Sequence, residues 1–250
     1  IPMTAALALN GLGLPIGFLI GLIGIGGVLL TPALVHLFGL NIHAGISLSL
    51  ASFVLAGVVG AARVTTDDAR LRAGDWVFLT AIVPAALAGA LVAPSIPKGS
   101  LSLIVSACVP FAGISSLRAP AGKNDSKLAP DTLGGLGAVT GFLSFISGTG
   151  GPLICLPLLL WKGMEVRRAL LLAQAAQLPV AATATLVNGC SASLDFAAAG
   201  IVGVSIVAGM LAGIGVSRKI DTGILRTCIA WSLVVAGLAL CLVDTIKLLS

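Results

Sequence analysis

Long apolar runs that carry almost no charge are the feature that most limits what this chain can fold into. A run of about 18 apolar residues allows an α-helix to cross the hydrocarbon core of a bilayer. Such runs lie at about 4–24, 44–62, 76–94, 100–117, 132–147, 169–187, 196–216 and 227–243. Only 9% of the 250 residues are charged, which is too few to cover a soluble domain. The sequence predicts an all-α, polytopic transmembrane helical bundle, multi-pass in a cell inner membrane or plasma membrane, with the lipid bilayer as a partner.

Two further apolar segments, Val28–Phe38 and Pro152–Trp161, are too short to span a membrane alone. About ten residues give roughly 15 Å of helix, half the thickness of the hydrocarbon core. Each segment is expected to pair with the long one before it. The pair either crosses twice or forms a re-entrant hairpin, and the loop charges agree with both.

Basic residues gather in four loops, at 63–75, 118–131, 162–168 and 217–226. Short loops rich in Lys and Arg stay on the cytoplasmic side, so these four are predicted to lie inside. The loops predicted to lie outside are 39–44, 95–100 and 188–195, together with both termini. The net charge of +5 is therefore read as an orientation signal, and no nucleic-acid partner is expected.

The chain also repeats itself, because Phe18–Gly27 aligns with Phe142–Gly151 at an offset of 124 residues. We predict a first transmembrane repeat at 1–118, a cytoplasmic linker at 119–131 and a second repeat at 132–250. Each repeat has five helical segments, including the broken or re-entrant hairpin. An odd number of segments inverts the second repeat, and inverted-topology repeats are typical of secondary transporters with a midplane site at the repeat interface.

Glycine clusters interrupt an apolar segment in each repeat. The clusters are Gly24, Gly26 and Gly27 in the first and Gly148, Thr149, Gly150 and Gly151 in the second. Irregular backbone at membrane depth is tolerated where it is buried in protein or lines a cavity, and N–H groups exposed at a new helix start attract anions. These residues are therefore candidate substrate-binding residues; the alternative is that the glycines allow close helix packing.

Polar side chains in the third segment of each repeat are further candidates. Ser47 and Ser52 belong to the first repeat, and Gln174 and Gln177, which share a helix face, to the second. Interhelical hydrogen bonding is the alternative, favoured for the serines and equally weighted for the glutamines. Because no Lys or Arg is expected at mid-depth, an anion between the two clusters would be held by neutral donors alone.

Other polar residues have two readings each. His36 and His43 are either proton relays or solvated polar ends, and the second reading is favoured. The basic pair at 167–168 either orients the chain or attracts anions to a cavity mouth. Asp75 and Asp195 are predicted to be helix N-caps.

With these residues in place, the chain resembles the TauE/SafE family of sulfite and organosulfonate exporters over nearly its whole length. The residues that carry the resemblance are Gly24-Ile25-Gly26-Gly27 with Thr31-Pro32, Gly148-Thr149-Gly150-Gly151 with Leu156-Pro157, and the pairs Asp75-Trp76 and Asp195-Phe196. Val28 stands where the family often has a third glycine. The resemblance implies export of small sulfur-containing anions such as sulfite or sulfoacetate.

Motifs of other function classes are missing from the sequence. It holds no Walker A motif, no HExxH and no G-x-S-x-G, and its five cysteines form no CxxC pair. We therefore expect no enzyme, no catalytic residue, no cofactor and no metal. The prediction is a secondary transporter of a small anionic substrate by alternating access, with a coupling proton or cation and a homo-oligomer as further possible partners. A passive anion channel is the alternative, and a membrane scaffold is disfavoured.

Overall fold

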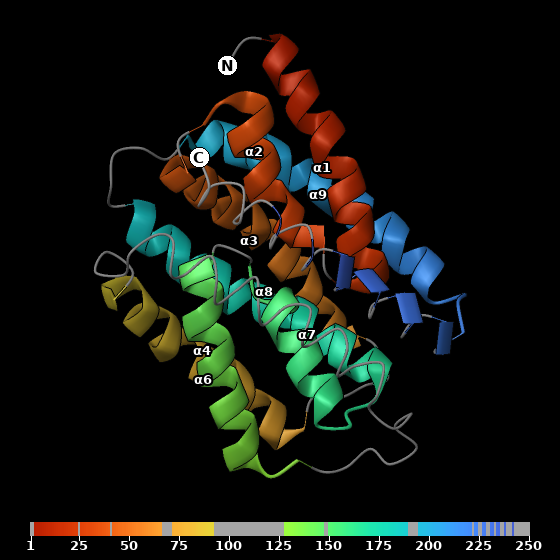
Figure 1. Cartoon of the computed structure of the whole chain (residues 1–250). Coiled ribbons are helices and arrows are strands. Elements are labelled where there is room, and N and C mark those ends of the chain that lie inside the picture. The colour runs from red at the N-terminus through yellow and green to blue at the C-terminus, as the bar shows by residue number, and fades with distance from the viewer. Residues whose placement is uncertain are drawn as a thin grey trace.

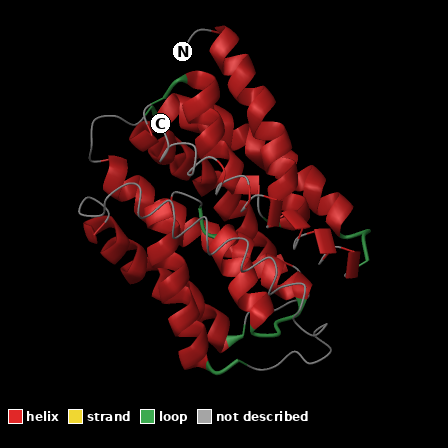
Figure 2. Ribbon diagram, in the orientation of Figure 1, coloured by secondary structure: helices red, strands yellow, loops and turns green. Residues whose placement is uncertain are grey.

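The computed structural model of the chain describes residues 3–24, 26–40, 42–66, 72–92, 128–147, 150–189 and 195–221, with scattered positions of 223–242. Every regular element within these ranges is a helix and none is a strand (Figure 2). The span predicted at 100–117 lies outside the described residues, as does most of the one at 227–243.

The long helices match the predicted spans. They are α1 (Met3–Ile23), α3 (Ile42–Thr66), α4 (Ala73–Val92), α6 (Pro130–Ser147), α8 (Val166–Gly189) and α9 (Phe196–Ser217). Among the described residues, α3, α4, α8 and α9 are long and apolar enough to cross a membrane. The prediction of an all-helical bundle with membrane-spanning segments is confirmed.

Glycines bring the long helices together in pairs. α1 and α9 run side by side in the same direction (Figure 1), and a Cβ at Gly17 or Gly21 would overlap the carbonyl of Ile206 or Met210. α4 and α6 also pair in parallel, with Gly141 against the carbonyl of Ile82. Small residues at such contacts let backbones approach without side chains between them, which stabilises helix pairs in lipid.

The third pair, α3 and α8, is antiparallel and lies between the other two pairs. Gly57 packs on Leu178, and Gly60 packs on the carbonyl of Gln174. α8 is the most enclosed span, with 61% of its apolar window buried against 28% for α4. The middle of α8 is therefore well shielded from lipid.

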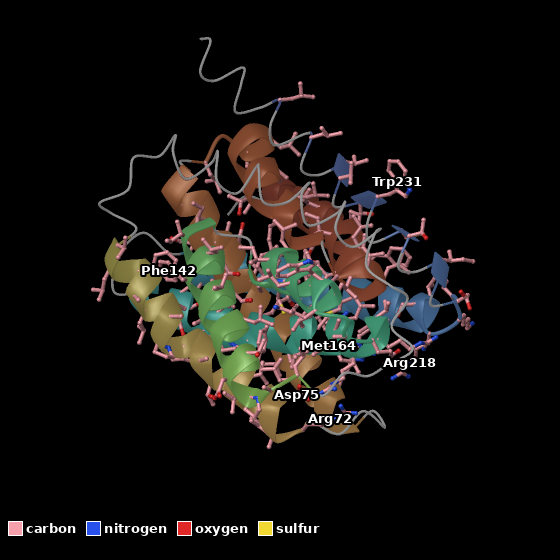
Figure 3. The ribbon with its side chains drawn as sticks, turned by 60° about the horizontal axis from the view of Figure 1, so that its bottom comes forward. Arg72, Asp75, Phe142, Met164, Arg218 and Trp231 are labelled. Atoms are coloured by element: carbon pink, nitrogen blue, oxygen red, sulfur yellow. The ribbon has the colours of Figure 1, made fainter. Side chains whose placement is uncertain are left out.

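The described parts of the four basic loops lie at one end of the molecule, which we call the basic end (residues 72–75, 128–130, 162–168 and 218–221). Asp75 pairs with Arg168, and Arg167 donates to the carbonyl of Ile220. Gly74 lies against residues 128–133. Figure 3 shows Arg72, Asp75, Met164 and Arg218 toward this end. The grouping matches the loops predicted to share one side of the membrane.

The outer surface of the bundle is apolar. On α4 the side chain of Leu91 is 82% exposed and that of Trp76 is 56% exposed, while Phe78 and Ile82 on the opposite face are buried. Trp76 and Trp161 both lie near the basic end, where Lys162 sits over the Trp161 ring. Tryptophan favours the membrane–water interface, so these residues suit a boundary of the lipid-facing band.

Candidate functional site

The first glycine break separates α1 from α2 (Leu30–Phe38). α1 ends at Ile23, Gly24 has a φ of +81°, and Gly26–Leu29 form a 3₁₀ turn before α2 begins. A φ of this value lies in the left-handed region, which is unfavourable for residues that have a Cβ, so this position requires a glycine. The predicted interruption is confirmed, although the short helix begins at Leu30, because Val28 belongs to the 3₁₀ turn.

The second glycine break separates α6 from α7 (Pro152–Trp161). Gly150 and Gly151 have φ values of +76° and +108°, and α7 begins immediately after them, as predicted. A Cβ at Gly150 would come within 2.8 Å of the Phe53 ring. Gly148 and Thr149 lie outside the described residues.

Both breaks lie against α8, on either side of Gln174. A Cβ at Gly24 would come 3.0 Å from the Leu170 side chain, and one at Gly151 would lie 3.6 Å from the carbonyl of Ala176. Leu170 and Ala176 are six residues apart, or roughly 9 Å along the helix axis. The structure thus brings one glycine of each cluster, Gly24 and Gly151, against α8.

The short helices offer fewer backbone donors than expected. Pro152 is the first residue of α7, and Pro32 lies in the first turn of α2. Proline has no N–H, so each of these helix starts lacks one of its donor groups. Side-chain donors must therefore contribute more to any anion site than the sequence reasoning assumed.

Gln174 is buried and has two hydrogen-bond partners. Its Nε2 donates to the carbonyl of Ile20 at 3.1 Å, and its Oε1 accepts from Arg63 Nη1 at 2.6 Å. The carbonyl of Ile20 also accepts from the N–H of Gly24 at 3.0 Å. Gln174 is therefore bonded to the end of α1 at the first glycine break.

Arg63 was placed in a loop by the sequence reasoning, and that placement is wrong. The residue lies in the last turn of α3, half-buried, and its guanidinium reaches Gln174. This contact places a charged donor beside one of the predicted site residues. One signal could have revealed it: Gly60 and Arg63 are three residues apart, so the arginine shares a face with a close-packing glycine.

Gln177 has no exposed surface, and neither atom of its side-chain amide has a hydrogen-bond partner among the described residues. It lies three residues beyond Gln174, on the same face of α8. A buried amide without partners costs on the order of 1–3 kcal/mol. The residue therefore has the donor and acceptor capacity to bind a ligand.

The serines of α3 have mainly structural contacts. Ser52 Oγ donates to the carbonyl of Leu48 in its own helix, so its bond is intrahelical and not the interhelical one favoured from sequence. Ser47 is half-buried. Ser49 accepts from Thr31 Oγ1 at 3.0 Å and ties α2 to α3. The side chains of the two histidines, His36 and His43, lie outside the described residues.

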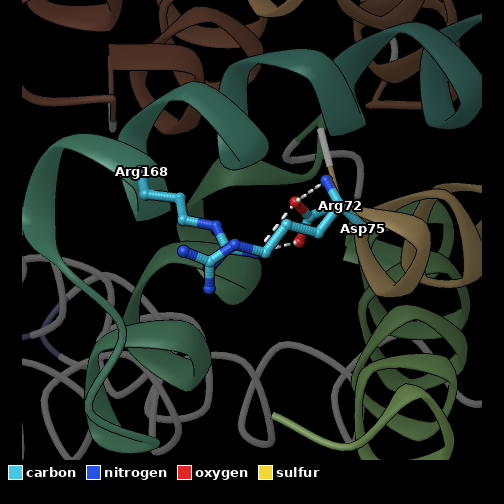
Figure 4. Close-up of polar contacts among 3 residues, drawn as sticks. All are labelled: Arg72, Asp75 and Arg168. Carbon is cyan, nitrogen blue, oxygen red and sulfur yellow. Dashed lines mark hydrogen bonds and ion pairs between the residues drawn. The ribbon is translucent and has the colours of Figure 1, made fainter. Parts of the chain in front are cut away.

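An ion pair connects the start of α8 to the start of α4 (Figure 4). Arg168 Nη2 lies 2.8 and 2.9 Å from the two oxygens of Asp75, which also accepts from the N–H of Arg72 at 2.9 Å. Asp75 is therefore not the predicted N-cap; it lies in the first turn and reaches back to the residue before the helix. Asp195 is the N-cap of α9, as predicted, and accepts from Ala198 N–H.

A helical bundle with membrane-spanning segments, an apolar outer face and helix breaks at left-handed glycines defines a polytopic membrane protein. The family model described as "Sulfite exporter TauE/SafE" matches residues 9–240. The chain therefore belongs to the TauE/SafE family of membrane transporters, which confirms the resemblance stated from its motifs. Neither the curated proteins nor the solved structures contain a match to it.

Proposed function

We propose that this chain is a secondary transporter that exports small sulfur-containing anions such as sulfite or organosulfonates. The substrate class follows from membership of the TauE/SafE family. The anion binds in the middle of the bundle, where the two glycine breaks approach α8. Transport proceeds by alternating access in a plasma membrane or inner membrane, with the basic end facing the cytoplasm.

The proposed site rests on one observation: the side-chain amide of Gln177 is buried and has no hydrogen-bond partner among the described residues. A primary amide supplies two N–H donors, and the oxygens of a sulfite or sulfonate are acceptors. An anion deprived of water needs such donors, because desolvating a charge without compensation costs many kcal/mol. Gln177 follows Ala176, whose carbonyl lies near Gly151 at the second glycine break.

We further propose that 1–118 and 132–250 are inverted repeats joined by the linker 119–131. The helix pairing supports this proposal, since exchanging the halves maps α1 with α9 onto α6 with α4. The glycines follow the same exchange: Gly17 faces α9, and its counterpart Gly141 faces α4. Such repeats are common in transporters that rock around a fixed midplane site.

Replacing Gln177 by Leu tests the site, because its effects on stability and binding should have opposite signs. The free energy of unfolding of the unliganded variant should equal or exceed that of the wild type, since an unpartnered amide is removed. Its affinity for sulfite and methanesulfonate should fall by about 5- to 150-fold, which corresponds to about 1–3 kcal/mol. Titration calorimetry on the detergent-purified protein gives both affinities.

The matched control is Gln174→Leu, which removes two hydrogen bonds and should lower the free energy of unfolding. Wild-type affinity in the Gln177→Leu protein would place the site elsewhere. If the wild-type protein binds neither anion, the proposed substrate class is wrong.

Flux measurements in proteoliposomes separate a carrier from a passive channel. A carrier gives a methanesulfonate flux that saturates with concentration and responds to an imposed proton or cation gradient. Ohmic conductance without saturation would contradict alternating access and support the channel.

A further inference from the structure

The guanidinium of Arg63 lies beside Gln174, one of the two buried glutamines of α8. Arg63 Nη1 donates to Gln174 Oε1 at 2.6 Å, and Gln177 follows one turn later on the same face of α8. Arg63 is half-buried in the last turn of α3; Arg168 is also half-buried but is paired with Asp75, and the arginines at 72, 167 and 218 are exposed. A full positive charge thus lies in contact with the buried Gln174 side chain.

The side chain of Gln174 has a defined orientation. Arginine only donates hydrogen bonds and a carbonyl only accepts them, so Oε1 must face Arg63 and Nε2 must face Ile20. Gln174 therefore bridges the guanidinium to the end of α1 at the first glycine break. It is better suited to hold Arg63 in position than to donate to an anion itself.

Close packing of the backbones keeps the guanidinium near α8. Gly60 lies against the carbonyl of Gln174, where any Cβ would overlap it, and Gly57 packs on Leu178. Because the two helices touch through glycines, Arg63, one turn beyond Gly60, leaves α3 already close to α8. Its side chain needs only to extend along the interface between α3 and α8 to reach Gln174.

Neutral donors are also scarce in this region. The first turn of α2 and the first turn of α7 each contain a proline without an N–H. Gln177 supplies donors but no charge. Guanidinium groups bind oxyanions such as carboxylates and phosphates through charge-assisted hydrogen bonds that are about twice as strong as neutral ones.

We propose that Arg63 is the cationic member of the substrate site, that the anion binds between its guanidinium and the Gln177 amide, and that Gln174 is a positioning residue. This inference rests on the proposed function and identifies what gives the site its preference for negative charge.

The test compares methanesulfonate with dimethyl sulfone, a neutral molecule of similar shape in which a methyl group replaces one oxygen. The wild-type protein should bind the anion more tightly. Arg63→Gln should reduce the affinity for methanesulfonate by about 10- to 100-fold, the value of a hydrogen bond to a charged group. It should leave the affinity for dimethyl sulfone nearly unchanged, so the preference for the anion disappears.

Two further variants control for structural effects. Arg63→Lys keeps the charge and should keep the preference for the anion, whereas Arg167→Gln removes a charge at the basic end and should bind both probes as the wild type does. If Arg63→Gln does not fold, Gln174→Glu gives the same test, because a carboxylate beside Arg63 neutralises it and should abolish the preference.

An unchanged preference for methanesulfonate in Arg63→Gln or in Gln174→Glu would overturn the assignment of Arg63. The proposed function would survive that result, provided that Gln177→Leu still weakens binding. Absence of methanesulfonate and sulfite binding in the wild-type protein would instead contradict the proposed function itself.

Discussion

At the first glycine break the chain passes through one left-handed glycine and a 3₁₀ turn before α2, whereas at the second break two successive left-handed glycines lead directly into α7. The surroundings differ as well. Gly24 faces the ends of leucine side chains on α7 and α8, while Gly150 faces the Phe53 ring on α3. The first break is therefore bordered by groups that can adjust, and the second by a rigid ring.

The aspartates at the starts of α4 and α9 show a similar contrast. Asp75 is 2% exposed and bound to Arg168, so it connects two helices that are distant in sequence. Asp195 is exposed, and its side-chain contact among the described residues is the cap of its own helix. The same residue pair, an aspartate followed by an aromatic residue, thus serves a tertiary contact in one place and a local one in the other.

The largest effect is expected for Asp75→Ala. Removing one partner of a buried ion pair typically costs about 3–5 kcal/mol. The free energy of unfolding, measured by denaturant titration in mixed micelles, should fall by this amount. The double variant Asp75→Ala with Arg168→Ala should recover part of the loss; if the single variant is as stable as the wild type, the pair is not structural.

A smaller effect is expected for Gly150→Ala, which forces a Cβ into a left-handed conformation and against Phe53. Backbone strain of this kind costs about 1–3 kcal/mol. Gly24→Ala should cost less, because the leucine ends near it can move, and the same unfolding titration compares the two variants. Adding Phe53→Leu should reduce the loss of unfolding free energy caused by Gly150→Ala and leave that caused by Gly24→Ala unaffected. Equal losses of unfolding free energy at the two glycines would contradict the difference in surroundings between the two breaks.

The smallest effect is expected for Asp195→Ala, which removes the N-cap of α9. Loss of a cap typically costs about 1 kcal/mol. Asp195→Ser retains an acceptor for the Ala198 N–H and should be close to the wild type in thermal unfolding followed by tryptophan fluorescence. A loss as large as that of Asp75→Ala would show that Asp195 also has a tertiary partner.

Local patterns in the sequence predicted the local structure well. Apolar length and glycine clustering located the long helices, both breaks and the short helix Pro152–Trp161, because these features depend on residues near one another in the chain. Asp195 was correctly assigned as a cap for the same reason. The basic loops gather at one end, as the distribution of Lys and Arg predicted.

Contacts between distant segments were not predictable in the same way. The reach of Arg63 to Gln174 spans 111 residues and that of Arg168 to Asp75 spans 93, and neither leaves a periodic trace in the sequence. Arg63 was misplaced because its helix continues to Thr66, one turn further than the apolar run suggested. The glutamines were identified as candidates, but only the structure distinguishes the bonded Gln174 from the unpartnered Gln177.

The glycine contacts of α1 with α9 and of α4 with α6 have a mechanical consequence. Where backbone touches backbone, no rotamers are available to absorb a displacement, so sliding by a single residue would drive carbonyls into Cα atoms. Each helix pair should then move as one rigid body. Any opening of the bundle must occur along the surfaces where these rigid bodies meet α3 and α8. The residues at those surfaces, rather than bending of the helices, then allow the two pairs to move relative to α3 and α8.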